Sequence, residues 1–172
     1  SSERMSVLIN DILNFSKLTH SDASFVSTNL NQILQHVLSD LELEIDNNQV
    51  RIEAGSLPQI EAIPIQMNQL FFNLIGNSLK FARPDIPLII RIEAKEIDEE
   101  RKKSFPSLDP SILYTELLFI DNGMGFDQQY AEKIFTIFQR LNNRSYKGSG
   151  IGLALCRRIV QYHRGEIFAI ST

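Results

Sequence analysis

Apolar residues near the start of the chain recur with helical spacing. In residues 5–18 they fall three or four positions apart, at Met5, Leu8, Ile12 and Phe15. This is the a/d rhythm of a helix that packs along another helix. Only two heptads are present, so an ordinary amphipathic helix docked on its own domain stays open as an alternative.

The same periodicity predicts four further helices. They cover residues 30–41, 64–83, 127–138 and 150–163. Thr28 or Asn29 can cap the first of these. The second opens with Pro64, a residue favoured at the first helical turn, and ends near Pro84.

Alternating or continuous apolar runs predict strands between and after these helices. The candidate strands are residues 49–54, 59–63, 87–97, 112–121 and 165–172. The charged, proline-bearing stretch 98–111 is expected to be a solvated hairpin connector without chemistry. With several strands consecutive in the middle of the chain, the order favours an α+β fold in which helices cover one face of a mixed sheet.

Composition narrows the class of protein. With 172 residues, 43% hydrophobic and 22% charged, the chain is expected to form one main soluble domain. A net charge of -4 gives no positive field, so nucleic acid is not an expected partner. The single cysteine, Cys156, lies in a helical apolar pattern and is expected in the core. No stretch has the layout of a membrane span or signal peptide, which fits a cytoplasmic domain.

Three glycines, Gly148, Gly150 and Gly152, precede the helix predicted over 150–163. Their spacing is not that of a dinucleotide-binding fingerprint, and no P-loop lysine follows them. A glycine-rich loop that enters a helix exposes backbone N–H groups to an anion such as phosphate. A plain tight turn is the alternative.

A second glycine cluster, "DNGMGF" at residues 121–126, directly follows an apolar strand. Asp121 at a buried strand end would need a hydrogen-bond donor. Gly123 and Gly125 leave room for a planar ligand, so the carboxylate could accept a bond from an exocyclic amine such as that of adenine. The alternative is a turn in which the aspartate bonds its own backbone.

Polar residues share one face of the helix predicted over 64–83. Asn73, Asn77 and Lys80 lie at i, i+4 and i+7. Amide oxygens can ligate Mg²⁺, and an ammonium neutralises phosphate. Solvent exposure is the alternative reading of this face.

The base acceptor, the cation ligands and the phosphate-binding loop together fit one ligand, a purine nucleotide with a bound cation. With these residues the sequence resembles the catalytic ATP-binding domain of a sensor histidine kinase. "NLIGNSLKFA" resembles the family's N box, "DNGMGF" its G1 box, "IFTIFQRL" its F box and "GSGIGLALCRRIV" its G2 box. The four motifs occur in the family order, and the likeness covers nearly the whole chain. The superfamily also includes gyrase, heat-shock chaperones and mismatch-repair ATPases.

The resemblance implies a Bergerat-type α/β sandwich that binds ATP between the N-box helix and a lid. It implies that Asp121 and the nearby Gly123 and Gly125 receive adenine, and that Asn77 with Asn73 engages Mg²⁺. Lys80 would meet phosphate. The remaining expected ATP-binding residues belong to the lid region: Phe135, Phe138, Arg140, Gly148, Gly150 and Gly152. Arg144 is a further lid residue with a hypothetical contact to the terminal phosphate.

Asn73 also bears on the type of reaction. In the hydrolytic ATPases of this superfamily a glutamate stands at this place and activates water, whereas the Asn73 amide is no base near neutral pH. With Asn73 and Lys80 as catalytic residues, the site is expected to transfer the γ-phosphoryl group to a nucleophile from another domain.

The resemblance names that nucleophile as a histidine, and the chain lacks it. His20, His36 and His163 do not stand in the family's H-E/D-x-x-R/K-x-P context. Residues 1–22 are therefore interpreted as the end of the dimerisation helix, and residues 23–172 as the catalytic domain, truncated at its last strand. Alone, the chain is expected not to autophosphorylate.

The expected partners follow from the same resemblance. They are ATP, the histidine-bearing dimerisation domain of a homodimeric parent chain, and the receiver domain of a response regulator. The parent is compatible with a membrane anchor upstream. The alternative function is an ATPase or a nucleotide-sensing module of the same fold without histidine kinase activity.

Overall fold

A computed structural model describes residues 2–19, 23–136 and 150–172 of the chain. The described helices are α1 (Ser2–Thr19), α2 (Leu30–Asp40), α3 (Glu42–Asn47), α4 (Pro64–Lys80), α5 (Glu99–Lys103) and α6 (Gly152–Tyr162), with 3-10 turns η1 (Gln128–Tyr130) and η2 (Lys133–Phe135). The described strands are β1 (Val26–Asn29), β2 (Arg51–Ala54), β3 (Gln59–Ala62), β4 (Ile89–Glu96) and β5 (Thr115–Asp121).

The strands form two small sheets. The larger has the order β2-β4-β5, with β2 parallel and β5 antiparallel to β4, so it is mixed as predicted. The smaller pairs β1 with β3 in antiparallel fashion. The expected strands at 49–54 and 59–63 therefore exist, although each pairs with a distant strand and β1 was not predicted.

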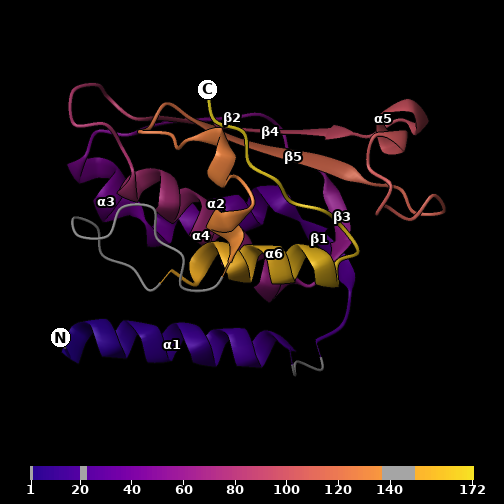
Figure 1. Ribbon diagram of the computed structural model, residues 1–172, viewed down its shortest axis with the longest axis horizontal. Helices are drawn as coiled ribbons and strands as arrows, with labels where there is room; N and C mark the ends of the chain where they lie inside the picture. The colour runs from indigo at the N-terminus through magenta and orange to yellow at the C-terminus, as the bar shows by residue number, and fades with distance from the viewer. Residues whose placement is uncertain (1, 20–22, 137–149) are drawn as a thin grey trace.

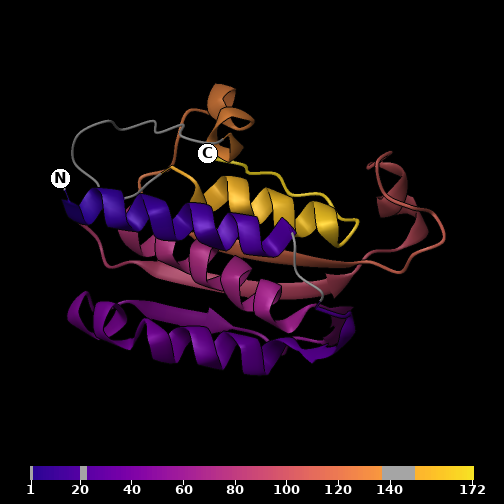
Figure 2. The ribbon, with the colours of Figure 1, turned by 90° about the horizontal axis from the view of Figure 1, so that it is seen from below.

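The helices α2, α4 and α6 cover one face of the three-stranded sheet (Figures 1 and 2). Alternation along β4 explains this. Ile90 and Ile92 are fully buried, whereas Arg91 between them and Glu93 after them are exposed. The core joins these isoleucines to buried residues of the three helices, among them Val37, Phe71 and Ile159. The predicted α+β class, with helices on one face of a mixed sheet, is confirmed.

Helix α4 runs through the centre of this core. Pro64 occupies its first turn, as the sequence predicted. Phe71 is fully buried and meets Phe119 of β5 edge to face, with 5.1 Å between ring centroids. The polar residues of α4 thus stand on a helix that is fixed against the sheet.

Helix α1 confirms the predicted helix at 5–18 and forms an outer layer. It lies on the far side of the other helices from the sheet and contacts α6 (Figure 1). Leu8 and Phe15 are partly covered, whereas Met5 is 63% exposed and Ile12 46%. Within the part of the chain that the structure describes, no helix is both long and apolar enough to cross a membrane.

The connector at 98–111 joins the antiparallel strands β4 and β5, as the predicted hairpin would, but it is not solvated throughout. It contains α5, at one end of the sheet in Figure 1. It also buries Lys102, which is only 7% exposed and donates hydrogen bonds to the carbonyls of Pro110, at 3.2 Å, and Ile112, at 2.7 Å. An ammonium can be buried here because two carbonyl oxygens accept its protons and the Glu99 carboxylate lies 3.5 Å away.

Two further element predictions were wrong. In place of one helix over 127–138, the described part has η1 and η2, with Asp127 capping η1 by accepting from the N–H of Gln129. The segment 165–172 has the exposure alternation of a strand but no ladder. Instead its Ser171 N–H donates to the Gln128 side chain and its Ser171 Oγ accepts from the Phe126 N–H, so this residue is bonded outside a sheet.

Candidate functional site

Asp121 ends β5 beside the last turn of α4. Its Oδ2 accepts a 2.6 Å hydrogen bond from the Ser78 hydroxyl, and its Oδ1 accepts a 2.9 Å bond from the Gly123 N–H. The carboxylate is exposed, because β5 is covered only as far as Phe119. The expected hydrogen-bond donors to Asp121 therefore exist. The expected burial of the Asp121 carboxylate does not.

The glycine after Asp121 is required by close packing. A Cβ at Gly123 would lie 2.8 Å from the Phe81 carbonyl oxygen and 2.9 Å from Asp121 Oδ1. The same carbonyl accepts a 2.9 Å bond from the Met124 N–H, which ties the loop to the end of α4. The path beside the carboxylate is thus kept free of side chains.

Gly125 serves the turn in a different way. Its φ is +67°, a left-handed conformation that favours glycine. A Cβ there would also lie 2.7 Å from Ser171 Oγ, which accepts from the Phe126 N–H at 3.0 Å. The glycine therefore lets the loop meet the C-terminal segment.

The two asparagines of α4 have different surroundings. The Asn73 amide donates to the Gly152 carbonyl at 3.3 Å and accepts from Gln69 Nε2 at 3.1 Å. The Asn77 side chain is half-buried and has no hydrogen bond to another described residue. Asn77 is thus the amide that is available to a ligand, while Asn73 bridges α4 and α6.

Lys80 closes the same helix. Its ammonium lies 5.1 Å from the centroid of the Phe81 ring. A cation at the helix C-terminus is favoured by the helix dipole, and its position one turn after Asn77 keeps it on the amide face. The face predicted from the spacing of Asn73, Asn77 and Lys80 is therefore carried by one continuous helix.

Helix α6 begins at Gly152, directly after the glycine loop. Gly150 has a φ of +76°, and the N-cap residue Ile151 offers no side-chain hydrogen bond to the helix start. The first N–H groups of α6 consequently have no side-chain cap among the described residues, a situation that suits an anion. Asn73 holds this helix start close to α4.

Phe135 is buried against α6 at the beginning of the expected lid. The Arg157 guanidinium lies 4.6 Å from its ring centroid and pairs with Glu132 at 2.9 Å. The other lid residues of the prediction, Phe138, Arg140, Arg144 and Gly148, lie outside the described residues.

Cys156 is a residue of α6 next to Asn73 of α4. It is fully buried, as predicted. Burial raises the pKa of its thiol to about 12, although a hydrogen bond with Asn73 opposes the shift. The thiol is therefore protonated at neutral pH and serves as a packing group.

Sequence reasoning missed three residues that organise the site. Ser78 holds Asp121 and Gln69 holds Asn73, while Asn122 accepts from the Ile89 N–H at 2.8 Å and donates to the Pro87 carbonyl at 3.0 Å. Two signals were available in the chain. Ser78 follows Asn77 directly, and Gln69 stands one turn before Asn73 on the same face.

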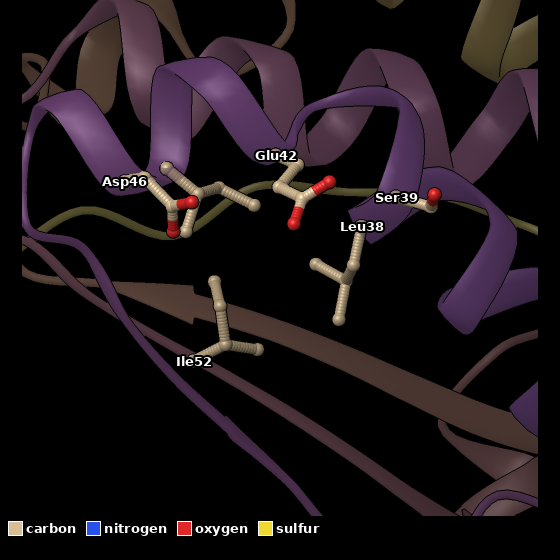
Figure 3. A pocket seen from close by; sticks show the side chains of 6 residues that line it. Leu38, Ser39, Glu42, Asp46 and Ile52 are labelled. Atoms are coloured by element: carbon tan, nitrogen blue, oxygen red, sulfur yellow. The ribbon is translucent and has the colours of Figure 1, made fainter.

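A pocket of about 320 Å³ lies elsewhere, between the α2–α3 segment and β2 (Figure 3). Its lining residues are Leu38, Ser39, Glu42, Ile45, Asp46 and Ile52. None of them belongs to α4, β5 or α6, so this pocket is separate from the candidate site.

The site thus combines three features: an acceptor at the end of β5, an amide face on α4 and a helix start at α6 that follows glycines. This combination matches a known family. Residues 62–172 match the model of the histidine kinase-, DNA gyrase B- and HSP90-like ATPases. The chain belongs to this family. It is an ATP-binding domain homologous to the catalytic domains of sensor histidine kinases.

One relative and two solved structures illustrate the likeness. The phytochrome-like protein Cph1 of Synechocystis sp. is 37% identical over 168 residues, which cover 97% of this chain and 20% of that protein. Full-length ShkA in complex with AMPPNP has a TM-score of 0.66 at 20% identity, covering 93% of this chain and 31% of that one.

The histidine kinase ThkA in complex with the response regulator protein TrrA has a TM-score of 0.68 at 19% identity, covering 99% of this chain and 44% of that one. The two structural likenesses concern the fold. The chain spans about a fifth of the length of the curated relatives it matches.

Proposed function

We propose that this domain binds ATP with Mg²⁺ and transfers the γ-phosphoryl group to a histidine on the dimerisation domain of its parent chain. The observation that carries the proposal is the Asp121 carboxylate, which Ser78 and Gly123 hold at the open end of β5. An exposed carboxylate with spare acceptor sites suits the exocyclic amine of adenine. The complex of ShkA with AMPPNP, an ATP analogue, supports the same ligand class.

The residues around Asp121 fit a purine nucleotide. The absence of a side chain at Gly123 leaves the approach to the carboxylate clear. The first N–H groups of α6, which no described side chain caps, suit the phosphates, and Gly150 and Gly152 let the backbone approach them. Within the lid, Phe135 would anchor the chain, and Phe138, Arg140 and Gly148 would complete the nucleotide contacts.

The donor set on α4 fits a hard cation. The Asn77 amide oxygen is a ligand type that Mg²⁺ accepts, and its side chain is not engaged by another described residue. Lys80 would neutralise phosphate, and bound Mg²⁺ would supply further charge neutralisation. Asn73 is the second candidate metal ligand, but its bonds to Gly152 and Gln69 would have to be shared or exchanged.

The chemistry of Asn73 favours transfer over hydrolysis. A neutral amide cannot take a proton from water, so this position supplies no general base. In the proposed transfer, a histidine ring nitrogen forms a bond to the γ-phosphorus while the bond from that phosphorus to the bridging oxygen breaks. ADP leaves and the imidazole releases its proton. Asn73 and Lys80 would act by positioning and charge neutralisation.

We also propose that α1 is the end of the helix that joins this domain to the dimerisation domain, in a homodimeric parent. Met5, Ile9, Ile12 and Leu13 on α1 are exposed, although each is a large apolar residue. A paired helix would cover them. The response regulator is the proposed next acceptor of the phosphoryl group, supported by the complex of ThkA with TrrA.

The binding step is tested with a fluorescent ATP analogue displaced by ATP, in wild type, Asp121→Asn and Asn77→Ala proteins. Asp121→Asn should weaken binding by about 1 to 3 kcal/mol, because an amide can present a donor to the adenine amine. Asn77→Ala should weaken only the Mg²⁺-dependent part. Unchanged binding in both variants would contradict the site assignment.

The transfer step is tested by mixing this domain with a histidine-bearing dimerisation domain and γ-labelled ATP. The expected product is an acid-labile, base-stable phosphoprotein. ATP binding with no label on the histidine domain would favour the nucleotide-sensing alternative. Steady phosphate release by this domain alone, surviving Asn73→Ala, would favour the ATPase alternative.

A further inference from the structure

Ser78 is a buried polar residue directly beside the proposed nucleotide site. It lies on the last turns of α4 and is 8% exposed. Its Oγ is 2.6 Å from Asp121 Oδ2 and 3.3 Å from the carbonyl oxygen of Leu74, one turn earlier. Both neighbours are acceptors, whereas a hydroxyl has a single proton to donate.

The shorter contact decides where that proton points. An ionised carboxylate accepts a stronger bond than a backbone carbonyl, and 2.6 Å is in the range of O–H···O⁻ bonds. Ser78 therefore donates to Asp121 and does not serve only to satisfy its own helix. A helix serine that bonded only the carbonyl four residues earlier would leave Asp121 with the Gly123 N–H alone.

Two donors on different oxygens fix the rotation of the carboxylate. Ser78 holds Oδ2 from the α4 side, and the Gly123 N–H holds Oδ1 from the loop side. A carboxylate has about four acceptor positions, so two remain. Because Asp121 is exposed, these remaining positions are accessible to a ligand.

We propose that Ser78 is a positioning residue for base recognition, which makes Asp121 select purines that carry an exocyclic amine. The inference rests on the proposed function. Ser78 does not touch the base in this proposal; it sets the direction in which Asp121 accepts. Without it, the carboxylate would turn about its bond to Gly123 and would lose most of its preference for an amine.

Ser78 also links the base to the rest of the site. It follows Asn77 on α4, so the proposed metal ligand and the support of the base acceptor are adjacent residues of one rigid helix. A second tie, from the Met124 N–H to the Phe81 carbonyl, joins the same helix end to the loop. The distance between the adenine and phosphate positions is thereby set by α4.

The test compares ATP with purine riboside 5′-triphosphate, which lacks the 6-amino group. Displacement of a fluorescent nucleotide gives both affinities for wild type, Ser78→Ala, Ser78→Cys, Asp121→Asn and Asn122→Ala proteins. Wild type should prefer ATP by about tenfold or more, the value of one hydrogen bond to a charged group. Ser78→Ala should remove most of this preference, and Ser78→Cys, a weaker donor, should remove part of it.

Asn122→Ala is the matched control. Its amide holds the backbone at Pro87 and Ile89 in the same turn but makes no bond to Asp121. It should change both affinities by the same factor and leave their ratio intact. Thermal melting of each variant tests whether it is folded. If Ser78→Ala does not fold, the nucleotide preference of Ser78→Cys tests the role of Ser78.

The outcomes separate this inference from the proposed function. If Asp121→Asn abolishes the preference but the Ser78 variants keep it in full, Ser78 is structural only and the inference is overturned. The same holds if Ser78→Ala weakens both nucleotides equally. If wild type itself shows no preference, the assignment of Asp121 to the base fails, and the role of Ser78 fails with it.

Discussion

Helix α4 meets its two neighbours in different ways. At its junction with β5, the buried contact of Phe71 with Phe119 is followed by a short charge-assisted bond from Ser78 to Asp121. At its junction with α6, the polar contacts are neutral and longer, with 3.3 Å from Asn73 to the Gly152 carbonyl and 3.1 Å from the Ile63 N–H to His163 Nε2.

The difference separates a prepared half of the site from an adjustable half. Bonds to a charged group are roughly twice as strong as neutral ones, so Asp121 is already oriented before a nucleotide arrives. The Asn73 bridge is weak enough for a ligand to exchange its partners at small cost. We infer that the base end of the site is rigid and that the phosphate end can reorganise around α6.

The largest expected effect comes from breaking the α4–β5 junction. Phe71→Ala removes a fully buried ring that contacts Phe119, and it should lower the free energy of unfolding by about 3–5 kcal/mol. Phe72, the next residue on α4, is 37% exposed, so Phe72→Ala should cost clearly less, about 1–2 kcal/mol. Urea unfolding measures the stability of both variants. Similar losses of stability would show that the contact between Phe71 and Phe119 does not fix α4.

A smaller effect is expected from the loop that follows β5. Gly125→Ala places a side chain at a φ of +67°, which should cost about 1–2 kcal/mol of stability. Gly55 is the matched control, because a Cβ there meets nothing within 4 Å and its φ is not positive. Gly55→Ala should therefore be neutral or stabilise by up to about 1 kcal/mol. Equal effects of the two substitutions in urea unfolding would contradict the strain at Gly125.

Local patterns predicted the parts of the fold that depend on one segment. The apolar stripe from Leu30 to Leu41 predicted α2, and the initial proline predicted the start of α4. The alternation of apolar and polar residues predicted β4. All three elements lie where expected. Asn29 also caps α2, as one of two candidates, by accepting from the N–H groups of Asn31 and Gln32. Spacing on α4 likewise put Asn73, Asn77 and Lys80 on one face.

Features that depend on distant partners were not predictable in the same way. β1 is a strand because β3 pairs with it, and the tail at 165–172 has strand-like alternation but lacks a ladder. Lys102 looks like a solvated charge in sequence, but it is buried, with two loop carbonyls and the Glu99 carboxylate as its partners. The role of Ser78 depends on its 2.6 Å contact with a residue 43 positions away.

The α4–α6 junction should show a division between the two asparagines. Asn73→Ala removes the bonds to Gly152 and Gln69 and should lower stability by about 1 kcal/mol. Asn77→Ala removes no hydrogen bond between described residues and should leave stability within about 0.5 kcal/mol of wild type. In ATP binding measured with MgCl2 and with EDTA, Asn77→Ala should lose the difference between the two conditions. The reverse pattern would assign the metal to Asn73.

The smallest effect is expected at the far end of the same junction, where His163 joins the end of α6 to the start of α4. Its Nε2 accepts from the Ile63 N–H, and its Nδ1 lies 2.8 Å from the Ile159 carbonyl, so the bonded ring is neutral with its proton on Nδ1. Burial lowers the pKa of His163 from its usual 6.5, although the bond to the Ile159 carbonyl opposes the shift. The unfolded chain then binds the proton more readily than the folded one. Stability that is fully present above about pH 6.5 is therefore lost as the pH falls below it.

Urea unfolding at pH 7.5 and 5.5 measures this dependence. Wild type should be less stable at pH 5.5, and His163→Gln should show a smaller difference between the two pH values because the titrating ring is gone. His36→Gln, at an exposed position of α2, should keep the wild-type difference. If His163→Gln and wild type respond equally to pH, protonation of His163 does not open this end of the junction, and the adjustable part of the interface is confined to Asn73.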